Sequence, residues 1–488
     1  MKTIIKNTVI AVFFMSFLGC NDEYFDVNSR TGTATIDLLK LEDLIGPAIK
    51  NTFVVQYYAE RTLGNYSQYF TTQGGDAYGR SEISGAWTTF YLNILPELNA
   101  LIEKSESVNA THFGAVGKIL IAANLGVLTD CYDNIPFSEA AKFGAGAAFD
   151  SQQDIYASLS TLLTEAISAL SSGDPSGYPI KNDRVYGGDA SKWLKLAYTL
   201  RARYKMHLIG RNGLGEATSA LADLQNGFTS NADDFQMTYP SDINNPWYSR
   251  EVLAVATGNS HDKISDQLVS YMDGKSYPYT TITLDPRLPV YAKITDASGI
   301  WRGYDTGGQG LTSDGINSGN TDFSDGGFYT NADAPLVIIT YAEAQFIKAE
   351  AAFLTNGGST TSTGTNATAY AAYKAGISAS MDKMGVAGAA YLTDASIDLG
   401  AGSLRLEHIM KEKYIANFLN PETFVDLRRY NFSTDVFKDF TLPLDHALSE
   451  YPGEFMVRTV YPGTEQTRNP DNVNANKQEP TVKVWWNN

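Results

Sequence analysis

Apolar residues recur every three to four positions along much of the chain, the spacing that places them on one face of an α-helix. The longest windows with this spacing predict helices near 41–63, 87–106, 111–131, 151–171, 190–210, 340–355, 367–385 and 403–419. Stretches with the alternating pattern of a strand are few and short. The pattern therefore predicts a fold that is mainly all-α.

The order of these windows predicts how the chain is divided. Successive helices are joined by short to medium connections, as in tetratricopeptide helix pairs, although no clean repeat is visible. We expect helical parts at about 36–226 and 336–430. Residues 227–335 are rich in Gly, Asp, Asn, Pro and Tyr, and a structureless loop of ~100 residues is improbable in a compact domain. They predict an irregular, loop-rich subdomain, and the Pro- and Asn-rich residues 431–488 predict a non-helical tail.

The N-terminus has the pattern of a bacterial lipoprotein signal. Lys2 and Lys6 precede an apolar run, Ile10–Leu18, which is too short for the ~20 residues of a membrane span. Gly19 and Cys20 follow at once. We interpret 1–19 as a signal peptide and Cys20 as the site of lipid attachment. An uncleaved anchor helix and an ordinary secretory signal are the alternatives.

Composition narrows the classes of partner. The net charge is −17 and no basic stripe is present, which argues against a nucleic-acid partner. If Cys20 carries lipid, the second cysteine, Cys131, has no partner and the fold depends on its core alone. The chain has 29 tyrosines, and such flat, amphipathic rings suit sugar or peptide surfaces as well as cores.

No motif for catalysis, a metal or a cofactor is recognisable. The five histidines lack metal-ligand spacing, and neither a G-x-S-x-G elbow nor a Walker loop is present. The Asp305–Gly327 run has oxygen ligands for calcium, but Asp325 stands where an EF-hand loop needs glycine. We therefore expect neither a metal nor a cofactor. The carboxylate pair of a glycoside hydrolase leaves no local signature, so a lipid-anchored glycan hydrolase stays an alternative.

Several segments resemble motifs of the SusD/RagB family of nutrient-binding outer-membrane lipoproteins, in its second SusD-like branch. They are the D-C-Y-D-N-I-P-F-S-E-A turn at 130–140, the helix start at 149–156, the Y-G-G-D-A-S-K-W and L-R-A-R segments at 186–203, Y-A-E and A-E-A at 341–351, Y-P-G-T-E with Asn469, and V-W-W at 484–486. The motifs occur in the family's order, so the resemblance covers most of a single SusD-like domain at 20–488. We expect most of these residues to build the fold and not to bind ligand.

The resemblance implies a function. Members are expected to be helical, to bind oligosaccharides and sometimes peptides at the cell surface, and to deliver them to a TonB-dependent, SusC-like barrel transporter without catalysis. Asn21, Asp22 and Glu23 resemble the surface-export signal of Bacteroidetes lipoproteins, so we expect the lipid anchor to hold the chain on the outer membrane, exposed at the cell surface. A helical scaffold for protein partners is the remaining alternative.

The ligand-binding residues are chosen from chemistry, because no family motif marks them. We select clusters in which aromatic and polar residues alternate in loops. They are Asp76, Tyr78 and Arg80, which lead to Trp87; Trp247 with Tyr248; and Trp301, Arg302 and Tyr304. Core packing is the alternative for each. It is strongest for Trp87, because Trp87, Tyr91 and Leu95 recur at four-residue spacing on one helical face.

Overall fold

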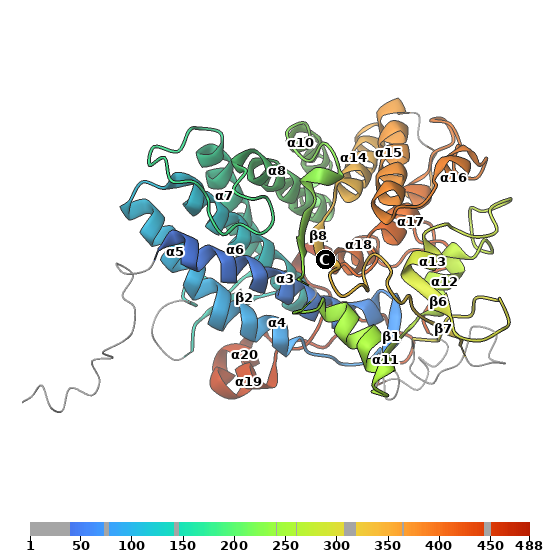
Figure 1. The fold of residues 1–488 in the computed structure, drawn as a ribbon, viewed down its shortest axis with the longest axis horizontal. Coiled ribbons are helices and arrows are strands. Elements are labelled where there is room, and N and C mark those ends of the chain that lie inside the picture. Colours follow the sequence, from blue (N-terminus) through green and yellow to red (C-terminus); the bar gives the residue numbers. More distant parts are fainter. Residues whose placement is uncertain are drawn as a thin grey trace, which may run out of the picture. The chain divides into compact units, whose positions relative to one another are not determined.

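The computed structural model describes residues 40–72, 78–140, 146–240, 242–259, 261–306, 319–363, 366–443 and 450–488. Its elements are mainly helical, which confirms the predicted fold class (Figure 1). Every window of helical spacing coincides with helix: α3 (Leu41–Tyr66), α4 (Ser84–Thr88) continued by the π-helix η2 (Thr89–Ile94) and α5 (Leu95–Ser107), α6 (Thr111–Tyr132), α7 (Gln152–Leu170), α8 (Ala190–His207), α14 (Tyr341–Thr355), α15 (Ala367–Met384) and α17 (Leu406–Ala416).

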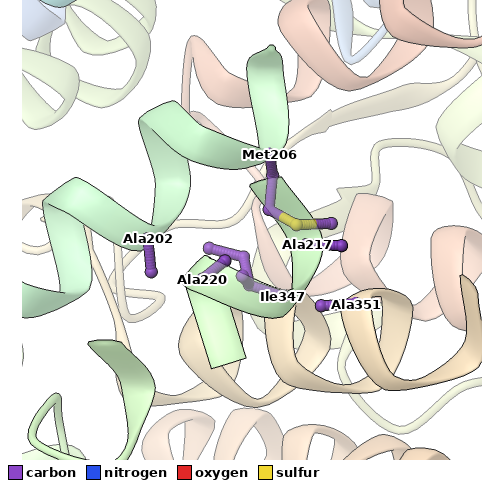
Figure 2. Close-up of a cluster of buried hydrophobic side chains, with 6 residues drawn as sticks. All are labelled: Ala202, Met206, Ala217, Ala220, Ile347 and Ala351. Carbon is purple, nitrogen blue, oxygen red and sulfur yellow. The ribbon is translucent and has the colours of Figure 1, made fainter. Parts of the chain in front are cut away.

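The helices pack as pairs of chain neighbours. Helix α6 packs against α5 and α7, α7 packs against α8, and α14 packs against α15 and α17. Helix α10 (Gly215–Leu224) closes the space between α8 and α14. Figure 2 shows the cluster where these three meet, formed by Ala202, Met206, Ala217, Ala220, Ile347 and Ala351. Small alanine side chains allow the helices to approach closely, so that a few larger side chains fill the contact.

Side-chain caps fix where several helices begin. The Asp189 carboxylate accepts a hydrogen bond from the Ser191 backbone N–H at 2.9 Å and starts α8. Thr340 caps α14 in the same way through the Glu343 backbone N–H. Each cap satisfies an N–H group that the first helical turn leaves without a partner.

The region 227–335 is irregular but well connected. Its elements are the 3-10 helix η3 (Asn231–Asp233), β4 (Phe235–Thr238), the π-helix η4 (Tyr248–Leu253), α11 (Ala254–Ala256), β5 (Asp262–Ile264), α12 (Asp266–Met272), α13 (Leu288–Tyr291), β6 (Ala292–Ile294) and β7 (Thr321–Phe323). Strand β4 pairs antiparallel with β8 (Pro335–Ile339), and β5 pairs antiparallel with β1 (Phe70–Thr72). Because β1 lies outside the region and β8 continues beyond its end, these ladders tie it to the helical body.

The tail differs from its prediction. It contains two short helices, α19 (Gly463–Arg468) and α20 (Pro470–Asn476), so it is not wholly non-helical. Pro470 lies in the first turn of α20, where its missing N–H costs nothing. The tail also contacts the turn at β2 (Ile135–Pro136) and β3 (Phe149–Asp150), because the Tyr461 hydroxyl donates to the Asn134 carbonyl at 2.7 Å. Composition alone does not reveal these contacts.

Many of the motif residues meet in one buried ionic network. Asp130 accepts hydrogen bonds from the Tyr156 hydroxyl at 2.6 Å and from the Trp486 indole N–H at 2.8 Å. The His207 ring lies 2.8 Å from Glu422, at the start of α18 (Glu422–Arg429), and 3.5 Å from Asp130. The motif residues at these positions therefore build the fold, as predicted.

The network continues through a second set of buried pairs. Arg203 donates to both Glu343 oxygens at 2.7 Å and to the Ile338 carbonyl at 2.8 Å. Arg429 donates to both oxygens of Glu350, at 2.7 and 3.0 Å. A buried charge is tolerated only where a partner of opposite sign and hydrogen bonds replace water. These pairs connect α8, α14 and α18.

Among the residues that the structure describes, one helix, Thr111–Tyr132, is long and apolar enough to cross a membrane, and it lies mostly inside the protein core.

Candidate functional site

The structure separates the predicted ligand-binding residues by exposure. Tyr78 and Trp247 are buried in the core. The Tyr78 ring packs edge-on against Tyr66, and the Trp247 ring packs edge-on against Tyr57 with centroids 4.8 Å apart. Neither ring offers a face to a ligand in this conformation. Asp76 and Cys20 lie outside the described residues.

Trp87 is also buried, but it borders a pocket. Its ring is 4 % exposed and is surrounded by Tyr91, Tyr132 and Tyr461. The pocket has a volume of about 590 Å³, and its lining also includes Leu92, Pro136, Ala147, Glu465 and Arg468. The aromatic neighbours leave little of the indole accessible from this space. Trp87 is therefore chiefly a packing residue.

Trp87 and Trp247 share an uncommon backbone setting. Trp87 lies two residues before the π-helix η2, and Trp247 immediately precedes the π-helix η4. A π-helix inserts one residue into a helical turn and often lies at a functional site. Here each π-helix adjoins a tryptophan that packs within a cluster of aromatic rings. In both places the tryptophan contributes to packing.

Arg80 and Tyr248 lie closer to solvent. The Arg80 guanidinium is exposed and contacts Glu479 at 2.5 Å, Glu450 at 3.5 Å and the Tyr451 hydroxyl. Tyr248 is half-buried in the first turn of η4. The protein's own carboxylates thus hold Arg80, which leaves it less available to a ligand.

The remaining three candidates form a half-exposed group, the Trp301–Tyr304 surface, which we define by Trp301, Arg302 and Tyr304 with Lys263 and Asp322. The backbone of Tyr304 is fixed against β5, because its N–H donates to the Ile264 carbonyl at 2.9 Å and its own carbonyl accepts from the Asp266 N–H at 2.9 Å. The rigid strand therefore positions the Tyr304 ring.

Polar groups from neighbouring strands complete this surface. The Lys263 ammonium, on β5, lies 5.6 Å from the centre of the Tyr304 ring and 2.6 Å from Asp322, on β7. His261 approaches the second Asp322 oxygen at 3.3 Å. Burial, together with the Asp322 carboxylate, raises the pKa of Tyr304, so its hydroxyl keeps its proton at neutral pH. The surface thus presents hydrogen-bond donors and acceptors around an aromatic ring.

Backbone contacts hold the chain around Trp301 in place. Arg302 exchanges two hydrogen bonds with Asn320, donating its N–H to the side-chain oxygen at 3.0 Å and accepting from the Asn320 N–H at 2.9 Å. Gly319 lies against the Tyr304 ring, where a Cβ would come within 2.5 Å of it. Only glycine fits there. The loop and the ring are therefore packed as one unit.

The Trp301–Tyr304 surface also lies beside the segment that leads to the first predicted cluster. The Thr306 hydroxyl donates to the Gln68 side-chain oxygen at 3.1 Å. Phe70 and Thr72 of β1 pair with Ile264 and Asp262 of β5. The structure thus brings the two segments together before the chain enters the undescribed residues around Asp76. Sequence reasoning missed Lys263 and Asp322, because nothing local marks residues that meet only where β5 and β7 lie side by side.

The described residues contain no group of three or more His, Cys, Asp or Glu side chains placed to hold a metal. Residues 307–318, within the run with calcium-ligand character, lie outside the description.

Comparison with known proteins identifies the protein family. The sequence model of the SusD-like_2 family, described as starch-binding and associating with the outer membrane, matches residues 34–454, so the chain belongs to this family. Its members are non-catalytic binding proteins, which removes the hydrolase alternative. No curated protein matches the chain.

Solved structures show the same fold. A chitin-binding protein shares 24 % identity over 92 % of this chain and 100 % of its own, with a TM-score of 0.73. A chitin-binding SusD homologue from Flavobacterium johnsoniae shares 21 % over 92 % and 98 %, with a TM-score of 0.72. A SusD homologue from Bacteroides uniformis shares 20 % over 92 % and 99 %, with a TM-score of 0.70. The helix pairs described above are thus those of a SusD-like fold.

Proposed function

We propose that this protein captures oligosaccharides at the cell surface and delivers them to a TonB-dependent, SusC-like transporter in the outer membrane. The observation that carries the proposal is the Trp301–Tyr304 surface in a chain of a glycan-binding family. It combines half-exposed aromatic rings with fixed donors and acceptors. Trp301, Arg302 and Tyr304 are the residues we assign to the ligand.

The chemistry of a sugar matches this surface. One face of a hexose offers C–H groups that stack on an aromatic ring, and its edge offers hydroxyl groups that both donate and accept hydrogen bonds. Trp301 and Tyr304 would take the C–H face, while Arg302, Lys263 and Asp322 would take the hydroxyls. Two relatives of similar fold are described as chitin-binding, so β-linked amino sugars are test ligands beside starch fragments.

The anchor and the partner form the second part of the proposal. Lipid on Cys20, followed by Asn21, Asp22 and Glu23, would hold the body at the outer membrane, in keeping with the family's description. A non-catalytic binder there needs a channel to import what it captures. The SusC-like barrel is that channel in our proposal, and sugar transfer to it requires no bond cleavage.

Calorimetry with malto- and chito-oligosaccharides tests the ligand surface. We expect Trp301→Ala and Tyr304→Ala each to weaken binding by about 1–3 kcal/mol, the range for an aromatic stacking contact. Tyr178→Ala is the matched control, because Tyr178 is an exposed aromatic residue (53 %) on a different loop. If all three folded variants bind with wild-type affinity, the surface is not the ligand site.

A further inference from the structure

We infer that a second pocket, distinct from the Trp301–Tyr304 surface, binds a short neutral saccharide. This α3–β4 pocket has a volume of about 800 Å³ and lies between the N-terminal half of α3, the 182–184 loop and the chain leaving β4. Its size falls within the ~300–1,000 Å³ typical of small-molecule sites. The ligand class is that of the proposed function, on which this inference rests.

A rigid loop forms one side of the pocket. The buried Asp183 carboxylate accepts four hydrogen bonds, from the backbone N–H groups of Val185, Tyr186 and Gly188 and from the Trp193 indole N–H, at 2.8 to 3.1 Å. Asn182 donates to the Glu42 carbonyl at 2.7 Å and so ties the loop to α3. The loop therefore holds Arg184 at the pocket without needing a ligand to order it.

The lining carries charges of both signs. Glu42 and Asp43 face the pocket together with Lys50 and Arg184, and none of these four side chains forms an ion pair within the described ranges. Apolar side chains, among them Met237 and Ile243, complete the wall. The pocket thus offers unused donors and acceptors beside an apolar surface.

The Tyr239 hydroxyl is a second, independent sign of a ligand. Tyr239 lines the pocket and is 5 % exposed, yet its hydroxyl has no hydrogen-bond partner among the described residues. Burial raises the pKa of Tyr239 to about 12, so the hydroxyl keeps its proton. A buried polar group without a partner costs free energy. The Tyr239 oxygen is itself covered by protein, so a bound polar group relieves this cost when the side chain turns toward the pocket.

The mixture of charges favours a neutral polyol over an ion. A ligand with a single charge would pair with either the acidic or the basic side chains of the lining, but it would face the like charges of the other set in the same pocket. A sugar hydroxyl both donates and accepts, so it satisfies groups of either sign. The apolar wall fits the C–H face of the same sugar. A zwitterionic peptide end is the competing occupant, and the experiment below separates the two.

The test measures binding of maltose, N,N′-diacetylchitobiose and a dipeptide to the full mature chain. Calorimetry gives the affinity, and thermal unfolding gives the shift in melting temperature that each compound produces. We expect one of the two sugars to bind and Arg184→Ala to weaken it about tenfold or more. Lys181→Ala is the matched control, because Lys181 is an exposed cation beside the same loop that does not line the pocket. The double variant Trp301→Ala/Tyr304→Ala should retain this binding event.

Tyr239→Phe separates a ligand role from a packing role. We expect it to leave the melting temperature of the free protein unchanged or higher, since it removes an unpartnered hydroxyl, and to reduce the upward shift that the sugar produces. A lower melting temperature with an unchanged sugar-induced shift would overturn the inference, as would dipeptide binding in place of sugar.

If sugar binding depends only on Trp301 and Tyr304, this inference fails while the proposed function stands. If neither the wild-type protein nor any variant binds a glycan, the inference and the proposed function both fail.

Discussion

The buried network and the Trp301–Tyr304 surface use the same kinds of side chain for different purposes. In the network, Arg203 and Glu343 are both under a tenth exposed, and each satisfies the other. At the surface, Arg302 and Lys263 have one carboxylate partner each and keep part of their side chains open to solvent. Charges that are fully partnered inside the protein stabilise one arrangement of helices, whereas partly open charges beside an aromatic ring can bind a ligand.

Removing one member of the network should have the largest effect. Glu343→Ala leaves the Arg203 guanidinium buried, with Glu422 at 3.6 Å as its nearest remaining carboxylate. Breaking a buried pair in this way costs about 3–5 kcal/mol of unfolding free energy, because the remaining charge loses its bidentate partner and keeps only the longer contact with Glu422. Chemical denaturation measures the loss.

Glu165→Ala provides the control for that variant. Glu165 pairs with Lys118 at 2.7 Å, but its side chain is 51 % exposed, so its removal should cost under ~1 kcal/mol. Equal losses for the two variants would contradict the contrast between buried and exposed pairs.

Acid should weaken the network in a defined pH range. Burial alone would raise the pKa of Glu422, but the neighbouring His207 and Arg203 outweigh it and lower the pKa to about 2, from a usual value of 4.5. A carboxyl whose pKa is lowered in the folded state stabilises the protein above its unfolded pKa, and this contribution disappears as the pH falls through the folded value. We therefore expect the loss from Glu422 between about pH 4.5 and 2.

Glu422→Gln isolates that contribution. The amide cannot titrate, so between pH 4.5 and 3 the unfolding free energy of this variant should fall less steeply than that of the wild-type protein. Urea denaturation at several pH values gives both slopes. Identical slopes would mean that Glu422 does not carry the acid sensitivity.

The same contrast explains how far the sequence could predict the structure. Helix positions follow from apolar spacing, and Asp189 could be recognised as a cap, because these signals are local. The network residues Asp130, Arg203 and Glu343 lie in segments with family resemblance, so their structural role was expected. The Trp301–Tyr304 surface has neither signal: Lys263 meets Asp322 only because β5 and β7 lie side by side. Tyr78 and Trp247 have the composition of a binding loop, and only the fold shows that they are buried.

Arg80 gives the smallest expected effect and tests whether the proposed ligand surface includes this residue. Its guanidinium lies 2.5 Å from Glu479, but the two side chains are 41 % and 57 % exposed, so water and salt screen the pair. We expect Arg80→Ala to change both the unfolding free energy and the glycan affinity by less than ~1 kcal/mol. Denaturation and calorimetry on one protein preparation measure both quantities, and a double-mutant cycle with Glu479→Ala isolates the pair. An affinity loss as large as that of Trp301→Ala would show that the ligand displaces Glu479 from Arg80. The binding surface would then include Arg80.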